Sequence, residues 1–212
     1  MSASLLPAAL RLVVILDARA ARGRDLAALG AAAVRGGATM LQVRGKQLGA
    51  GPLAELTRDV LAAANVPILV NDRLDVALAT GAAGCHLGQD DFPIAVAHTI
   101  VPAGFLLGGS AGDAAEARRA AAAGAHYLGI GPLHGTLNKP AAGSAIGVAG
   151  FRTIAAAGAL PAVAIGGVSV EDVPALIQAG AAGVAVIGAV LDAPDPEAAT
   201  RSLRAALDRA LS

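Results

Sequence analysis

Short apolar runs recur along the whole chain, and each one ends at polar or glycine-rich residues. The runs cover residues 12–16, 40–43, 68–70, 84–87, 105–107, 127–130, 162–165 and 184–187. Their positions are apolar consecutively rather than alternately, which is typical of strands covered on both faces. The pattern therefore predicts eight buried strands in parallel arrangement.

Segments rich in alanine and leucine lie between these runs, and their apolar residues recur at helical spacing. Clear examples are residues 25–35, 52–64, 113–123 and 170–179. Several helical segments end at a glycine-alanine step, where glycine favours a left-handed helix C-cap. These glycines are Gly37, Gly81, Gly124 and Gly180. At the other end of their helices, Asp113 and Ser169 are suited to the N-cap position.

The predicted strands and helices alternate, eight of each, which indicates repeated parallel βαβ units. Eight repeats in 212 residues suit a compact (β/α)8 TIM barrel. A doubly wound open sheet is the alternative, because periodicity alone does not show closure of the sheet. No linker or charge run divides the chain, so we expect a single domain over residues 1–212.

The composition argues against several classes of protein. The formal net charge is zero and no basic block appears, so nucleic acid is not an expected partner. Cys85 is the single cysteine and lies inside an apolar run, where a small core residue is expected rather than a thiol site. The N-terminal apolar run is interrupted by charges at Arg11 and Asp17, which makes a signal peptide a weak interpretation. No segment has the length and apolarity of a membrane span, so we expect a cytoplasmic protein.

Polar residues of both charges follow the predicted strands, and the C-terminal strand ends of a barrel share one face. Asp72 and Asp91 follow neighbouring strands, and with phosphate oxygens and water they would suit Mg²⁺. Arg44, Lys46 and Lys139 follow other strands, where they could meet phosphate oxygens. Glycines follow the last two strands and expose backbone N–H groups, as in many phosphate sites of barrels.

Each of these residues also has a purely structural interpretation. Asp72 could cap the helix that follows it. Arg44 could be the partner in a structural ion pair. Asp90 is expected to be solvated rather than ligating. The combination of metal-type acids and phosphate-type cations on one face favours the functional interpretation.

At this point the chain resembles the thiamine-phosphate synthase family. The motifs that carry the resemblance are "QVRGK" at 42–46, "NDRLD" at 71–75, "HLGQDD" at 86–91, "GIGPLHGTLNK" at 129–139 and "AIGGV" at 164–168. The similarity runs from about residue 12 to the end of the chain. The family reaction displaces pyrophosphate from a hydroxymethylpyrimidine diphosphate by the nitrogen of a thiazole phosphate, giving thiamine phosphate.

The resemblance implies a role for each matching residue. Mg²⁺ would be bound by Asp72 and Asp91. The pyrimidine diphosphate would be bound by Gln42, Arg44, Lys46, Asn71, Ser110 and Lys139. The thiazole phosphate would be bound by Thr136, Leu137, Asn138, Gly167, Ile187 and Gly188. The residues expected to act on the leaving pyrophosphate are Arg44, Lys46, Ser110 and Lys139. Both substrates are small molecules, no membrane partner is expected, and a homodimer is a candidate assembly.

The motifs depart from the family pattern at several positions. Gly45 stands in place of a Glu, Asn138 in place of a Thr, Gly188 in place of a Ser, and His134-Gly135 in place of Phe-Pro. A related branch of barrels tautomerises the thiazole phosphate with a histidine in the loop that contains His134, so this activity is an alternative. A non-catalytic phosphate-binding barrel is a second alternative, although the intact acidic pair argues against it.

Overall fold

The computed structural model describes residues 6–135 and 144–212, and its strands form a closed parallel barrel. The strands are β1 (Leu12–Asp17), β2 (Met40–Arg44), β3 (Ile68–Asn71), β4 (Gly84–Leu87), β5 (Leu106–Ala111), β6 (Tyr127–Ile130), β7 (Ala162–Ile165) and β8 (Gly183–Val186). Each strand pairs with its neighbour in sequence, and β8 pairs with β1 to close the ring. This closure confirms the predicted TIM barrel and excludes the open sheet.

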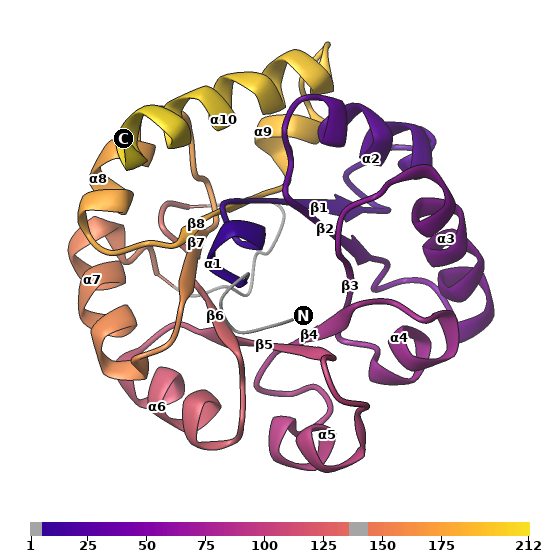
Figure 1. Cartoon of the computed structure of the whole chain (residues 1–212), viewed down its shortest axis with the longest axis horizontal. Helices are drawn as coiled ribbons and strands as arrows, with labels where there is room; N and C mark the ends of the chain where they lie inside the picture. Colours follow the sequence, from indigo (N-terminus) through magenta and orange to yellow (C-terminus); the bar gives the residue numbers. More distant parts are fainter. Residues whose placement is uncertain (1–5, 136–143) are drawn as a thin grey trace.

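Apart from the first, the helices surround the barrel in sequence order (Figure 1). They are α1 (Leu6–Ala9), α2 (Leu26–Arg35), α3 (Ala50–Ala63), α4 (Leu74–Thr80), α5 (Ile94–Ile100), α6 (Ala114–Ala122), α7 (Gly147–Gly158), α8 (Val173–Gln178), α9 (Gly188–Leu191) and α10 (Pro196–Leu211). The short α1 and α9 were not predicted, and Figure 1 shows α1 within the ring of strands. Among the described residues, no helix is long and apolar enough to cross a membrane.

Most predicted helix ends are confirmed, and one is corrected. Gly37, Gly81, Gly124 and Gly180 all have positive φ angles, as the glycine-alanine steps predict. Asp113 caps α6 by accepting from the backbone N–H of Glu116. Ser169 does not cap α8, because the helix begins later and Asp172 precedes it. Instead, the backbone N–H and hydroxyl of Ser169 both donate to the Asp172 carboxylate.

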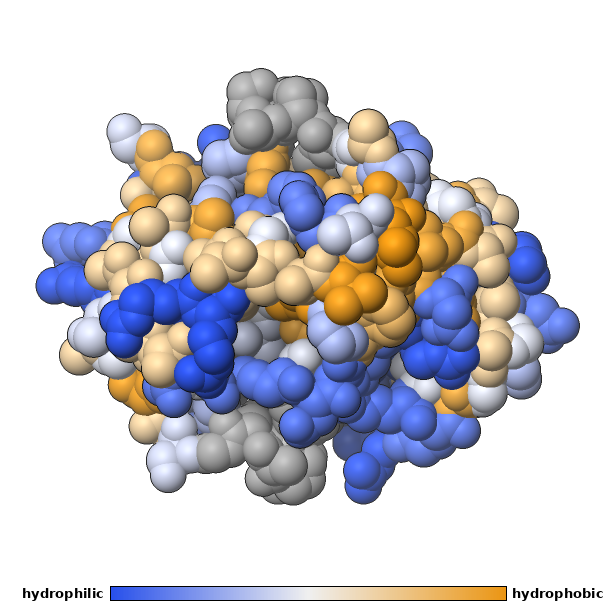
Figure 2. Space-filling model, turned by 90° about the horizontal axis from the view of Figure 1, so that it is seen from below, coloured by the Kyte–Doolittle hydropathy of each residue, from blue (hydrophilic) through white to orange (hydrophobic). Residues whose placement is uncertain are grey.

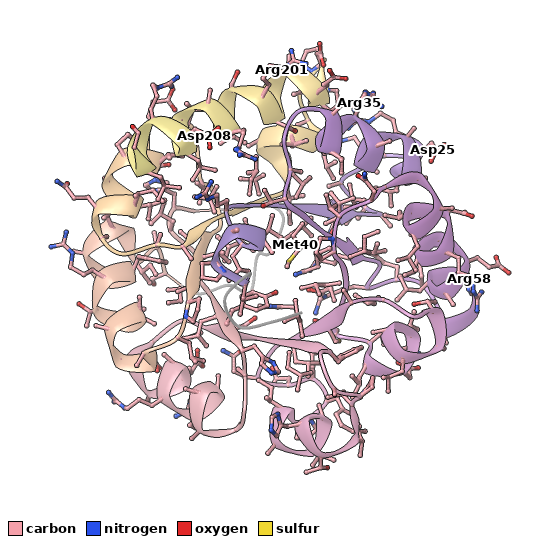
Figure 3. The ribbon with its side chains drawn as sticks, in the orientation of Figure 1. Asp25, Arg35, Met40, Arg58, Arg201 and Asp208 are labelled. Atoms are coloured by element: carbon pink, nitrogen blue, oxygen red, sulfur yellow. The ribbon has the colours of Figure 1, made fainter. Side chains whose placement is uncertain are left out.

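Alternate residues of each strand point into the barrel and form a core of their own. This inner core contains Leu6, Leu10, Val13, Ile15, Met40, Leu69, Leu106, Tyr127, Val163 and Ala185. Figure 3 shows Met40 inside the ring, while the charged side chains of Arg58 and Asp208 extend from the outer helices. Cys85 belongs to the outer core, and burial raises the pKa of its thiol, in agreement with a structural role.

The last helix closes the outer layer by packing against the first units of the barrel. Arg35 Nε on α2 lies 2.8 Å from Glu197 Oε2 on α10. Arg204 Nη1 donates to the carbonyl of Gly37 at 3.2 Å. A Cβ atom at Gly36 would lie only 2.5 Å from the Glu197 carbonyl oxygen, so glycine allows the close approach of the two segments. This seam joins residues from opposite ends of the sequence.

Candidate active site

A cavity of about 630 Å³ opens at the C-terminal ends of the strands. Every described residue that the sequence assigned to a site lines this cavity: Gln42, Arg44, Lys46, Asn71, Asp72, Asp91, Ser110, Gly167, Ile187 and Gly188. Thr136, Leu137, Asn138 and Lys139 lie outside the described residues. The barrel therefore brings together the acids, cations and glycines that the sequence places after different strands.

The two-residue repeat of the strands explains how these side chains reach the cavity. On β2, the inner-core residue Met40 is followed at two-residue steps by Gln42 and Arg44. On β5, Leu106 is followed in the same phase by Gly108 and Ser110. The inward row of each strand thus passes from apolar core at the bottom to polar groups at the mouth.

Arg44 forms a buried ion pair with Asp17 as well as lining the cavity. The two residues are register partners on β1 and β2, and Arg44 Nη1 donates to Asp17 Oδ2. Asp17 is only 3% exposed, and its other oxygen accepts from the backbone N–H groups of Arg19 and Ala20, each at 2.9 Å. The structural interpretation of Arg44 is therefore correct, and the ion pair fixes the guanidinium at the cavity wall.

The acidic pair lies on the adjoining wall, with Lys46 beside it. Lys46 Nζ is 2.8 Å from Asp72 Oδ2. Asp91 Oδ2 accepts from the backbone N–H of Gly88 at 2.7 Å. Burial raises the pKa of Asp91, and its hydrogen-bonding contact with the Asp72 carboxyl raises the pKa further. The neighbouring Asp90 is exposed and does not line the cavity, in agreement with its predicted solvation.

Asp72 has an unusual backbone that sets the direction of its side chain. Its φ angle is +64°, in the left-handed region that aspartate tolerates better than most residues. Its backbone N–H donates to the carbonyl of His86 at 2.8 Å, which ties the end of β3 to β4. The residue before α4 is Arg73, without a side-chain cap. The helix-capping interpretation of Asp72 is therefore wrong, and its carboxylate lies in the cavity.

The chemistry of these donors fits Mg²⁺ better than a metal held by protein ligands alone. Asp72 and Asp91 place two carboxylates side by side, and the ammonium group of Lys46 contacts Asp72. These three side chains together have more acidic than basic groups. Within residues 6–135 and 144–212, no cluster of three or more His, Cys, Asp or Glu side chains could hold a metal. Mg²⁺ commonly takes one or two carboxylates and fills its remaining positions with water and phosphate oxygens.

Further polar side chains on the cavity wall escaped the sequence prediction, among them His86, Tyr127 and Glu116. His86 and Tyr127 are buried within apolar runs, so only the inward phase of β4 and β6 would have indicated them. Glu116 is in the first turn of α6 and accepts from Gln89 Nε2 at 2.7 Å and from the Gly112 N–H at 2.6 Å. Together with Asp113, it adds to the carboxylates of the wall.

Glycines on β5 and β6 provide the space for the buried His86 and Tyr127 rings. Gly108 is the register partner of both residues. A Cβ at Gly108 would lie 2.4 Å from His86 Nδ1 and 2.4 Å from Tyr127 Cζ. A Cβ at Gly129 would lie 2.9 Å from His86 Cε1. The apolar run predicts that this strand ends at residue 107. In the structure β5 continues to Ala111, because Gly108 leaves space for the two rings instead of starting a turn.

The glycine wall lies opposite, after β7 and β8. Gly166 and Gly167 have φ angles of +91° and +72°, which favour glycine at both positions. A Cβ at Gly166 would also lie 2.8 Å from Pro132. Ile187 and Gly188 line the cavity where α9 begins. At Gly166, Gly167 and Gly188 this wall presents backbone without a side chain to the cavity.

His134 is hydrogen-bonded to Asp172 and does not line the cavity. Its Nε2 atom lies 2.9 Å from Asp172 Oδ1. Burial alone would raise the pKa of Asp172, but hydrogen bonds from His134 and Ser169 lower it below its usual value. This contact holds His134 against the segment that precedes α8, which gives the histidine a structural partner.

The chain is similar to known proteins in sequence and structure. Residues 12–190 match the family model described as thiamine monophosphate synthase. A thiamine-phosphate synthase of Roseiflexus sp. (strain RS-1) is 46% identical over 205 residues, which cover 93% of this chain and 85% of that protein. One from Chloroflexus aurantiacus is 45% identical over 92% of this chain and 91% of that protein.

Two solved structures extend the comparison. A thiamine phosphate pyrophosphorylase from Pyrococcus furiosus has a TM-score of 0.88 and 34% sequence identity. The match covers 98% of this chain and 100% of that chain. A 3-hexulose-6-phosphate synthase has a TM-score of 0.72 at 23% identity, covers 93% of this chain and 99% of that chain, and shares the fold alone. On the family match and the identities above, the chain belongs to the thiamine monophosphate synthase family.

Proposed function

We propose that this protein is a thiamine-phosphate synthase, a transferase of thiamine biosynthesis. The observation that carries the proposal is that the acidic pair Asp72 and Asp91 and the cations Arg44 and Lys46 line the same cavity. That arrangement suits a diphosphate that must leave. Family membership supplies the substrates, a hydroxymethylpyrimidine diphosphate and a hydroxyethylthiazole phosphate.

The reaction breaks one bond and forms another at a single carbon. The C–O bond between the pyrimidine methylene and the diphosphate breaks, and its electron pair leaves with the diphosphate. The lone pair of the thiazole nitrogen then forms the new C–N bond. No proton has to move in this step, because the nitrogen becomes a positively charged thiazolium. The protein therefore has to position the substrates, exclude water and stabilise the growing negative charge.

We assign the pyrimidine diphosphate to the wall formed by β2 to β5. Gln42 lies two residues before Arg44 on β2 and is therefore deeper in the barrel. Gln42 would contact the pyrimidine ring, while Arg44 and Lys46 would contact the phosphates. Asn71 and Ser110 would supply further hydrogen bonds on either side. Lys139, outside the described residues, is proposed by motif position as a third cation on the leaving group.

We assign the thiazole phosphate to the glycine wall. Gly167, Ile187 and Gly188 would supply backbone N–H groups to the phosphate, and this explains how the chain can dispense with the usual serine at 188. Thr136, Leu137 and Asn138 are proposed for the same substrate by motif position only.

We propose Mg²⁺ as the metal, held by Asp72 and Asp91. When bound, the ion would neutralise charge on the leaving diphosphate. Asp72→Asn is a better test than Asp72→Ala, because asparagine tolerates the left-handed backbone and changes mainly the charge. Asp91→Asn should lower activity and weaken Mn²⁺ binding, measured by electron paramagnetic resonance, whereas Asp90→Asn should change neither. Equal effects at positions 90 and 91 would contradict the metal assignment.

The direct test of the function is to mix the purified protein, Mg²⁺ and both substrates, and to measure thiamine phosphate and pyrophosphate. Both products should form in equal amounts. A parallel reaction with a thiazole phosphate tautomer alone tests the isomerase alternative. Because His134 is held by Asp172 and does not line the cavity, it supports coupling over tautomerisation. Isomerisation without any coupling would overturn the proposal.

We further propose a cytoplasmic location and a homodimer. Figure 2 views the side of the molecule on which α5 lies and shows an apolar patch there among hydrophilic residues. Val96 and Ile100 are one helical turn apart on α5 and are 49% and 55% exposed. Sedimentation equilibrium of the wild type and of Val96→Asp tests this contact. A wild type that is monomeric at every concentration would exclude it.

A further inference from the structure

A chain of hydrogen-bonded polar groups runs along the cavity wall and ends at Ser110. Tyr127 Oη lies 3.0 Å from His86 Nδ1, and His86 Nε2 lies 3.1 Å from Ser110 Oγ. Tyr127 is 1% exposed and His86 is 9% exposed. Both ring nitrogens of His86 therefore face hydroxyl groups from neighbouring strands.

The direction of these hydrogen bonds follows from the buried phenol. Burial raises the pKa of Tyr127, so its hydroxyl keeps its proton and must donate it to an acceptor. His86 Nδ1 lies 3.0 Å from Tyr127 Oη and can accept this proton. The Tyr127 proton is then directed at His86 Nδ1.

The tautomer of His86 follows from that proton. A neutral imidazole that accepts at Nδ1 carries its own proton on Nε2. Nε2 then donates to Ser110 Oγ. Because the Ser110 oxygen accepts from the ring, its own proton points away from the ring and toward another acceptor.

We propose that Tyr127 and His86 are positioning residues that hold the Ser110 hydroxyl as a hydrogen-bond donor to the diphosphate of the substrate. The proposal rests on the function proposed above. An ionised diphosphate offers only acceptors, so a serine that presents lone pairs would oppose it. In the reversed chain, Ser110 would donate to His86 Nε2 and turn its lone pairs to the cavity.

The surrounding glycines support a built arrangement rather than a chance contact. Gly108 lies between His86 and Tyr127 in the register, and any side chain there would separate the two rings. Ser110 is two residues further along the same strand, so it shares the inward phase with Gly108. One strand thus provides both the space for the rings and the hydroxyl that they orient.

The kinetic test compares Tyr127→Phe, Ser110→Ala and the double variant. Each single change should lower kcat by roughly tenfold or more, as one oriented hydrogen bond is lost. The double variant should be no slower than Ser110→Ala, because Tyr127 acts only through Ser110. Thr57→Val is the matched control, since it also removes a buried hydroxyl, bonded to the Leu53 carbonyl at 2.7 Å in α3, away from the cavity. Losses that multiply in the double variant would overturn the proposal.

A spectroscopic test does not depend on activity. In protein labelled with ¹⁵N-histidine, long-range ¹H–¹⁵N correlation spectra distinguish the two tautomers. The chain has four histidines, and replacing the other three one at a time assigns His86. We expect the Nε2–H form in the wild type and a mixture in Tyr127→Phe. An Nδ1–H form in the wild type would overturn the proposal even if coupling is observed. The Nε2–H form without coupling would refute the proposed function instead.

Discussion

Replacing Asp17 by asparagine tests the buried ion pair that holds Arg44 at the cavity. The change is nearly isosteric, and Oδ1 of asparagine can still accept from the N–H groups of Arg19 and Ala20. The amide nitrogen, however, would face the Arg44 guanidinium, so a donor would meet a donor. The buried cation would lose its counter-charge while the backbone turn is kept.

The size of the effect follows from the burial of the two side chains, which are 15% and 5% exposed for Arg44 and Asp17. Removing one partner of a buried pair costs about 3–5 kcal/mol, and the retained backbone contacts favour the lower value, about 3 kcal/mol. For a chain of this length, 3 kcal/mol corresponds to a fall in Tm of roughly 6–12 °C. Removing the cation as well, in Asp17→Asn with Arg44→Gln, should restore part of this loss.

The assay is thermal and urea denaturation at neutral pH, with Asp75→Asn as the control. Asp75 pairs with Arg73 at the surface, where the two side chains are 61% and 36% exposed. A surface pair of this kind contributes about 0–1 kcal/mol, so the control should lose little stability. Equal losses for Asp17→Asn and Asp75→Asn would refute the reasoning, because burial would then make no difference.

Three other variants test the site. Gly108→Ala should lower the free energy of unfolding by about 1–3 kcal/mol and reduce the coupling rate, because the new Cβ would lie 2.4 Å from both His86 Nδ1 and Tyr127 Cζ. The control is Gly51→Ala in α3, where a new Cβ would have no atom within 4 Å. This variant should be as stable as the wild type or more stable in the same denaturation experiment. His134→Ala should keep the coupling rate within about twofold, and a loss of activity in a folded variant would return the histidine to the chemistry. The lowered pKa of Asp172 stabilises the fold above the unfolded pKa of about 3.9, and this contribution disappears as pH falls through the folded pKa. Asp172→Asn should therefore flatten the acid side of the stability profile, and an unchanged profile would speak against the His134 contact.

The sequence was sufficient to locate the strands and most of the cavity wall. Parallel strands buried on both faces are apolar throughout, so their positions are visible as runs. Closure of the barrel then gathers the residues after those runs onto one face, which is why Asp72, Asp91 and Arg44 meet. This inference needs only strand order and direction.

What the sequence could not show depends on pairing between strands. His86 and Tyr127 lie within apolar runs, and only the register with Gly108 reveals that their rings share one pocket. Asp17 ends the first run, but its role depends on being opposite Arg44. Ser169 has the right residue type for a cap, yet the turn around Asp172 delays the helix. Each miss concerns a tertiary contact that local propensity does not contain.

The seam between α10 and α2 bears on how the chain folds during synthesis. The pairing of Leu12 with Val184 closes the barrel, and α10 covers that junction through Glu197 and Arg204. Neither contact can form until nearly the whole chain has left the ribosome, and contacts so distant in sequence form slowly. The edge of β1 that pairs with β8 must therefore wait, unpaired, while the later units emerge. A chaperone that shields these first units should raise the yield of folded protein more than one that acts on the last units.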